Sequence, residues 1–190
     1  MALAAAAVLV GLILVRGVSA RDQPTFVEAF VARRLRSLAI PRATRARQNP
    51  VPPTPEVLSG ARAHFADHCA SCHGNDGKGQ TALGRNMYPK APDMTLPETQ
   101  RLSDGELFAI IENGVRFTGM PAWGSPGPED DAETWELVHF IRHLPRITPE
   151  ELDQMKGMNP KTKKELDEEE AIRHFLGGEA PLPETGSHEH

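Results

Sequence analysis

The sequence predicts an all-α protein. Three stretches between residues 54 and 145 repeat apolar side chains at helical spacing, and each opens on a recognised helix-start signal. No stretch shows the alternation of apolar and polar residues that marks a half-buried strand. The 17 prolines indicate several non-helical connections. With only 5% aromatic residues, the 190-residue chain is expected to form one small core with appendages.

Charge divides the chain into a basic N-terminal part and an acidic remainder. Residues 16–47 contain eight basic and two acidic side chains, residues 48–144 contain seven and thirteen, and residues 145–190 contain six and eleven. The respective net charges are therefore +6, −6 and −5. Because the basic residues of the acidic parts are scattered and outnumbered, the sequence predicts no nucleic-acid partner.

Residues 1–18 are expected to be an N-terminal membrane anchor or a signal segment. Residues 2–15 are all apolar or glycine, a run shorter than the roughly 20 residues of a typical spanning helix. The small residues up to Ala20 suit signal peptidase, but the basic region that normally precedes such a segment is missing. A recorded start downstream of the true one would explain that gap. We expect an anchor, with cleavage near Ala20 as the alternative.

Two further segments precede the folded domain. Residues 19–40 are predicted to form a basic amphipathic helix that begins at a capping box of Thr25 and Glu28. Such a helix could lie on anionic lipid, or it could be a solvated spacer. Residues 41–53 are rich in proline and poor in hydrophobic residues, so they are expected to form an extended linker.

The folded domain is expected to comprise residues 54–145. The first helix begins with Thr-Pro, the second with a Ser-x-x-Glu capping box and the third with a cluster of acidic residues. The three helices are expected from Thr54 to Cys69, from Ser103 to Gly114 and from Asp130 to Pro145. Residues 146–190 are predicted to form an acidic helical extension, loosely packed or exposed, with a disordered tail.

The run Cys69-Ala70-Ser71-Cys72-His73 is the chemical centre of the sequence. Two thiols at this spacing can add across the vinyl groups of a haem while the adjacent histidine reaches the iron. A zinc site would need further ligands, and the chain has no other cysteine. A thioredoxin-like pair would need a βαβ setting, which the sequence does not indicate. We therefore expect one haem c, attached through Cys69 and Cys72 and ligated by His73.

The glycine-rich run Gly74-Asn75-Asp76-Gly77-Lys78-Gly79 extends this motif. Together they resemble the class I c-type cytochromes, the monohaem cytochrome c family, in its membrane-anchored bacterial form. The likeness covers residues 54–145. It implies the cytochrome c fold, with three to five helices around the haem and the first helix crossing the last. Ala61 and Phe65 on the first helix and Phe140 on the last would make the crossing contact.

The second axial ligand of the iron is expected from Met120. Glycine and proline on either side of it shape an irregular loop, which can deliver a sulfur where a helix could not. The Gly-Met-Pro sequence also resembles the ligand loop of the family. Met87 and Met94 lie in another proline-rich loop and are the alternatives, or they pack against the ring as core residues.

The resemblance also implies partners for the histidine and for the haem propionates. In the family a proline carbonyl accepts a hydrogen bond from the axial histidine and fixes its orientation. Pro92 is expected in this role, with Pro89 as the alternative. Arg85, Tyr88 and Trp123 are candidate propionate partners, or rim residues without that role.

Other side chains have weaker signals. Trp135 is expected to pack between helices. His139 and His143 lie four apart on the last helix, so they could bind a metal, but they also fit a solvent-facing stripe. His188 and His190 could bind a transition metal weakly or be incidental.

A histidine and a methionine together saturate haem iron and raise its reduction potential. The sequence therefore predicts a one-electron carrier between redox partners, not an enzyme, with no small-molecule substrate. Its acidic domain predicts partner proteins with a basic docking surface. Because haem c is attached after export, we expect the periplasmic side of the bacterial inner membrane. The alternatives are a haem-based sensor with Met120 absent or labile, a cytochrome subunit of a larger oxidoreductase complex, and metal handling by the tail.

Overall fold

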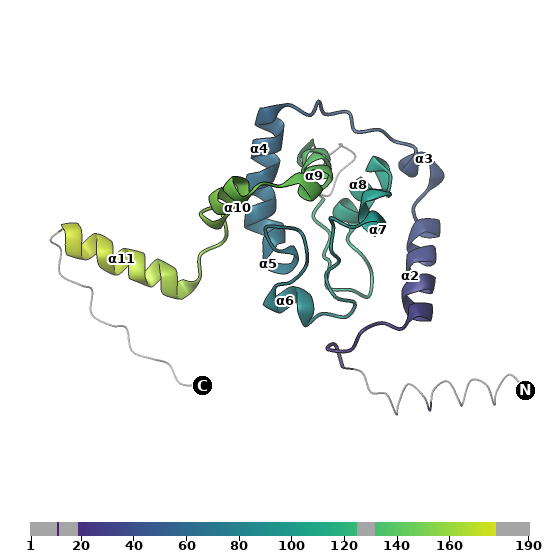
Figure 1. Cartoon of the computed structure of the whole chain (residues 1–190), viewed down its shortest axis with the longest axis horizontal. Helices are drawn as coiled ribbons and strands as arrows, with labels where there is room; N and C mark the ends of the chain where they lie inside the picture. Colours follow the sequence, from purple (N-terminus) through teal and green to yellow (C-terminus); the bar gives the residue numbers. More distant parts are fainter. Residues whose placement is uncertain (1–10, 12–18, 125–131, 178–190) are drawn as a thin grey trace, which may run out of the picture. The chain divides into compact units, whose positions relative to one another are not determined.

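The computed structural model describes residues 11, 19–124 and 132–177, and every regular element within these ranges is a helix (Figure 1). The all-α prediction is thereby confirmed for this part of the chain. The predicted N-terminal hydrophobic helix, apart from Gly11, and the tail from residue 178 lie outside the described residues. Among the helices that are described, none combines the length and the apolar content needed to cross a membrane.

The chain divides into two compact units, residues 1–159 and residues 160–190. The helices of the first unit are α2 (Phe26–Ala39), α3 (Arg42–Arg45), α4 (Pro55–His64), η1 (Phe65–Cys69), α5 (Ala70–His73), α6 (Ala82–Arg85), α7 (Pro97–Gln100), α8 (Asp104–Asn113), α9 (Ala132–His143), η2 (Leu144–Arg146) and α10 (Pro149–Lys156). The second unit contains α11 (Lys163–Gly177). Thr162 and Glu165 bond to each other's backbone amides at its start, as a capping box requires.

One continuous helical stretch leads into the cysteine motif. The Thr54 hydroxyl accepts a hydrogen bond from the Val57 amide, and Pro55 occupies the first turn of α4, as the sequence predicts. At η1 the helix widens to a π-helical turn, in which the Ala70 amide donates to the Phe65 carbonyl. Such turns rotate the residues that follow them relative to the preceding helix and often occur at functional sites.

The expected crossing contact forms the core. Ala61 of α4, Phe65 at the start of η1 and Phe140 of α9 are all buried. The Phe65 and Phe140 ring centroids lie 5.0 Å apart, close enough for a favourable tilted pair. Earlier in α9, Trp135 is fully buried and stacks on Phe108 of α8 at 4.1 Å, which confirms its packing role.

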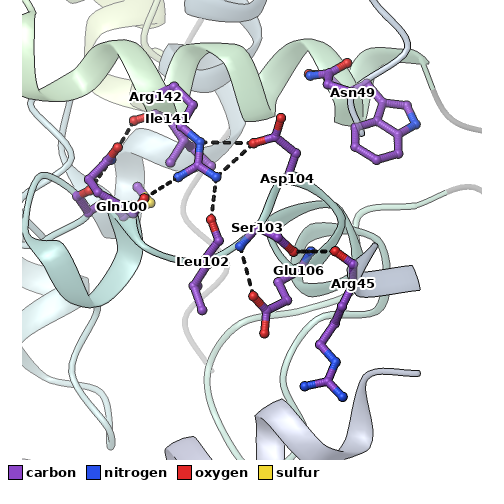
Figure 2. A network of polar contacts seen from close by, with 11 residues as sticks. Arg45, Asn49, Gln100, Leu102, Ser103, Asp104, Glu106, Ile141 and Arg142 are labelled. Atoms are coloured by element: carbon purple, nitrogen blue, oxygen red, sulfur yellow. Dashed lines mark hydrogen bonds and ion pairs between the residues drawn. The ribbon is translucent and has the colours of Figure 1, made fainter. Parts of the chain in front are cut away.

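Arg142 ties α9 to the loop before α8 (Figure 2). Its guanidinium donates to the carbonyls of Gln100 and Leu102 and to the Asp104 carboxylate, the last at 2.8 Å. The side-chain amide of Gln100 donates in turn to the Ile141 carbonyl at 2.9 Å. These bonds satisfy loop carbonyls that would otherwise lose their solvent partners when α8 and α9 come together.

The segment at residues 41–53, which its composition predicts to be an extended linker, is instead an arm docked on the domain. The Asn49 side chain donates to the Trp135 carbonyl at 2.7 Å. The Arg47 guanidinium lies over the rings of Phe108 and Trp135, 4.9 and 5.0 Å from their centroids. Composition is a poor guide here because the arm binds mainly through polar side chains and backbone groups, with Val51 as its apolar contact to the core.

The segment after α9 also belongs to the compact first unit, and α10 is not a loose appendage. Met155 of α10 is fully buried. The Glu151 carboxylate accepts a hydrogen bond from the His143 ring at 2.9 Å and pairs with Arg62 at 3.3 Å. Through these contacts α10 binds to both α9 and α4.

Replacing Phe140 with alanine removes a fully buried ring from the contact between α4 and α9. We expect Phe140→Ala to lower the free energy of unfolding by about 3–5 kcal/mol. The matched control is Phe26→Ala, because the Phe26 ring is 79% exposed, and its effect should stay within about 0.5 kcal/mol. Denaturant unfolding followed by circular dichroism measures both changes. Equal effects would contradict a core role for Phe140.

The contact of α10 should weaken in acid. Burial by itself raises the pKa of Glu151, but hydrogen bonds from His143 and the Thr148 amide, with the charge of Arg62, lower it below its ordinary value. A carboxyl group with a lowered pKa stabilises the fold above its unfolded pKa of about 4.3, and this contribution is lost as the pH falls through the folded value.

We therefore expect the thermal unfolding midpoint of the wild-type protein to drop more steeply below about pH 4.3 than that of Glu151→Gln. Glu150 is an exposed neighbour on the same helix, so Glu150→Gln should keep the wild-type pH dependence. Parallel curves for all three proteins would show that Glu151 has no part in it.

Candidate functional site

The cysteine motif lies where the π-helical turn returns to an α-helical one. Cys69 ends η1, and Cys72 and His73 belong to α5. Both thiols are free and partly buried. Residues three apart on a helix lie within about 60° of each other around its axis, so the two sulfurs share one side of the helix. This arrangement matches the demand of attachment to two vinyl groups on one ring.

The Cys69 thiol is not poised for disulfide exchange. Burial raises its pKa to about 12, with a further contribution from the neighbouring Cys72. A thiol with such a pKa is protonated at neutral pH, whereas disulfide-exchanging nucleophiles act as thiolates. The thioredoxin-like alternative is therefore disfavoured by the thiol itself, and the described residues bring no further group of zinc ligands together around it.

A glycine turn after the motif brings a second segment to the histidine. Gly79 has a φ of 68°, and a Cβ there would collide with the Ala91 carbonyl, so only glycine suits this position. The Gly79 amide donates to the His73 carbonyl at 2.7 Å, and the Met94 amide donates to the Gly77 carbonyl at 2.8 Å. The segment from residue 91 to 94 is thus held against the turn that follows the histidine.

The His73 ring is half-buried beside Pro92. Burial lowers the pKa of His73, and the Pro92 carbonyl partly opposes this by favouring the protonated ring. The Nδ1 atom is buried, and no group among the described residues completes a hydrogen bond of normal geometry with it. The lowered pKa favours the neutral imidazole, and Pro92 is the proline whose carbonyl acts on the ring. Its role toward an axial histidine stays a prediction.

These side chains fit a covalently bound haem c. A neutral imidazole is the form that ligates iron. Nδ1 is the buried nitrogen of the ring, so Nε2 is the atom that would face the iron. Cys69 and Cys72 would hold the porphyrin and His73 would hold the iron.

The loop that carries Met120 folds back onto the end of α8. Gly114 turns the chain with a φ of 62°, and a Cβ there would collide with the backbone around Pro121. The Val115 amide then donates to the Met120 carbonyl at 3.1 Å, and the Met120 amide donates to the Thr118 hydroxyl at 3.1 Å. These bonds fix the backbone on both sides of the methionine, whose side chain is half-buried.

The two alternative methionines occupy different surroundings. Met94 is buried and belongs to the hydrophobic core. Met87 lies against the Met120 loop, because its sulfur and side-chain carbons occupy the space where a Cβ of Gly119 would stand. The structure therefore brings two thioethers, Met87 and Met120, to the same loop and places the third in the core.

A contact that sequence reasoning missed joins this loop to the motif helix. The Trp123 ring meets the His68 ring edge-on at 5.6 Å, and His68 immediately precedes Cys69. The Trp123 amide also donates to the Ile111 carbonyl at 3.1 Å. The position of His68 next to the motif was the available signal, but its partner lies 55 residues further along the chain.

The other rim candidates are exposed. Arg85 and Tyr88 lie on the surface, and Lys90 donates to the Arg85 carbonyl at 2.7 Å. Partial desolvation raises the pKa of Tyr88, and the nearby Glu28 carboxylate of α2 raises it further through its charge and a hydrogen bond. The structure thus places Tyr88 beside the N-terminal helix, and its role toward a propionate stays a prediction.

The paired histidines of α9 form neither a metal site nor a solvent-facing stripe. The His139 ring donates to the Val51 carbonyl of the arm at 2.7 Å, and the His143 ring donates to Glu151 of α10. Within the described ranges, no three histidine, cysteine or acidic side chains are grouped as metal ligands. His188 and His190 lie outside those ranges.

Comparison with known proteins agrees with this geometry. Residues 56–141 match the family described as cytochrome C oxidase, cbb3-type, subunit III. The cbb3-type cytochrome c oxidase subunit FixPc of Rhizobium leguminosarum bv. viciae is 32% identical over 94 residues. That match covers 49% of this chain and 30% of the relative, so less than a third of the relative's length is represented. Residues 56–141 are therefore a c-type cytochrome domain, of the kind found in subunit III of cbb3-type oxidases.

Proposed function

We propose that this chain is the cytochrome c subunit of an oxidase complex and relays single electrons through one covalently bound haem c. The observation that carries the proposal is the half-buried His73 next to two free thiols three residues apart, in a domain similar to an oxidase subunit. Of the functions expected from the sequence, the likeness to subunit III favours the subunit of a larger complex over an independent carrier.

The chemistry depends on how the chain holds its cofactor. When bound, haem c supplies one-electron exchange at its iron. Cys69 and Cys72 would hold the porphyrin at the end of the motif helix, and His73 would hold the iron. Met120, whose loop is fixed by backbone hydrogen bonds, would supply a second ligand. An iron held by these two side chains would leave no position open to a small molecule, so the site suits electron relay rather than substrate turnover.

The proposed docking surface rests on the net charge of the domain, and the proposed location rests on the N-terminal segment. Residues 48–144 carry a net charge of −6, which favours a basic docking surface on the partner. Arg85, Tyr88 and Trp123 are exposed and would lie at the rim of the site. We place the domain on the periplasmic side of the inner membrane, held there by residues 1–18.

The identity of the second axial ligand can be tested by spectroscopy. Met120→Leu should abolish the long-wavelength band of the oxidised protein and lower the reduction potential, because leucine keeps the volume but has no sulfur. Met94→Leu is the core control and should keep the band, as should Met87→Leu. Loss of the band in Met87→Leu with its retention in Met120→Leu would instead make Met87 the ligand.

The rate of electron exchange between this chain and a soluble redox partner with a basic surface should fall as salt is added. Attraction between an acidic and a basic surface speeds encounter, and a drop of about tenfold from low to high ionic strength is expected. Stopped-flow mixing of the reduced partner with the oxidised protein over a range of salt concentrations measures it. A flat or rising dependence would contradict the acidic docking surface.

Purification from native membranes in mild detergent tests the subunit role itself. We expect the chain to co-purify with a haem-containing oxidase core and to give a pyridine haemochrome spectrum of one haem c, retained in acidified organic solvent. Recovery of the red protein alone after salt washing would overturn the subunit assignment. A colourless mature protein would overturn the whole proposal.

A further inference from the structure

Helix α2 presents its bulky apolar side chains to the outside. Its 14 residues contain no buried side chain. Six large apolar residues are between 45% and 79% exposed: Phe26, Val27, Phe30, Val31, Leu35 and Leu38. At 100° per residue these six lie within one half of the helix circumference. An apolar face of this width normally packs against a core or another apolar phase.

The opposite side of α2 is the one that faces the domain. Ala29 and Arg36 are half-buried and lie about 20° apart around the helix axis, opposite the apolar face. Ser37 is also half-buried, at the margin of the apolar face next to Phe26. Ser37 accepts a hydrogen bond from Arg45 of α3, and burial lowers the pKa of Arg36, which Glu106 of α8 partly opposes. Small and polar residues thus make the contact with the domain. The apolar face of α2 consequently points away from the domain.

The charge of this face indicates what covers it. Arg33 and Arg34 are exposed, and the Arg34 guanidinium lies 5.3 Å from the Phe30 ring centroid, within the apolar face. Residues 16–47 carry a net charge of +6, in contrast to the acidic domain that follows. Apolar side chains interspersed with arginines match the boundary between acyl chains and anionic headgroups, where arginine can reach phosphate while its stem stays in the apolar layer. The apolar residues 2–15 precede this helix in the chain.

We propose that α2 lies in the interface of an anionic phospholipid bilayer, with its outward apolar face inserted below the headgroups and its arginines among the phosphates. The inference goes beyond the proposed redox function, because it concerns a surface of α2 and requires no electron transfer. Because the arm at residues 41–53 is docked on α8 and α9, the haem domain would be held beside the same membrane surface.

The test uses the full haem-loaded chain with one added cysteine, since Cys69 and Cys72 are consumed by the haem. Val31→Cys places a polarity-sensitive fluorophore on the apolar face, and Ala32→Cys places it on the exposed neighbour 100° around the helix. Each protein is mixed with vesicles of phosphatidylcholine alone, or with added phosphatidylglycerol, that carry a shallow lipid-borne quencher. The visible haem spectrum reports that each variant is folded.

With phosphatidylglycerol present, the Val31 probe should shift to the blue and be quenched, and the Ala32 probe should change much less. The response should be weaker on phosphatidylcholine alone. Replacing Arg33 and Arg34 with glutamine should weaken insertion about fivefold for each arginine removed.

Three results would overturn the proposal. Probes that stay in water while the protein is vesicle-bound would mean that residues 1–18 bind alone and a protein partner covers α2. Shielding of the Val31 probe without vesicles, rising with protein concentration, would identify a second copy as the occupant. Equal responses on both lipid compositions would remove the role of anionic headgroups. None of these results bears on haem binding, so the proposed function stands or falls separately.

Discussion

The contact between the Phe65 and Phe140 rings is the constraint on which the rest of the domain depends. It holds α4 against α9, and η1 and α5 continue α4 without a break. The direction from which Cys69 and Cys72 enter the site is therefore set by this packing, one turn away from the chemistry. The arm and α10 in turn bind to side chains and carbonyls of α9, so both depend on its position.

The two flanks of the site are built from backbone bonds rather than from side chains. Gly79 on one side and Gly114 on the other let the chain turn so tightly that amides bond to carbonyls only a few residues away. Such bonds do not depend on neighbouring side-chain identity, but they do depend on the absence of a Cβ at the turns. The proposed electron relay would benefit from this rigidity, since the side chains proposed to hold the iron are placed before the cofactor is bound.

Much of the fold could be predicted because its signals are local. Thr54 and Ser103 cap their helices through amides three residues away, and the cysteine motif lies within two helical turns. The crossing residues Ala61, Phe65 and Phe140 followed from the likeness to a known family, and their burial agrees with it.

The parts that sequence reasoning missed involve partners far apart in the chain. Asn49 bonds to a carbonyl 86 residues away, and His139 bonds to one 88 residues away in the other direction. Neither bond leaves a periodic pattern, so a proline-rich arm resembled a free linker and two bonded histidines resembled a surface stripe. In the site, the position of the Pro92 carbonyl near His73 and the approach of Met87 to Gly119 depend on how the loops fold, which spacing alone does not determine.

The docked arm has a consequence for how far the redox centre can travel. Thirteen free residues would let the domain wander over roughly 20 Å from its attachment point. The hydrogen bonds that join Asn49 and Val51 of the arm to α9 remove that freedom. The distance between α2 and the haem domain is therefore set by these contacts and not by the length of the chain between them. The cofactor would then sit at one height above whatever α2 rests on, and an electron acceptor would have to meet it there.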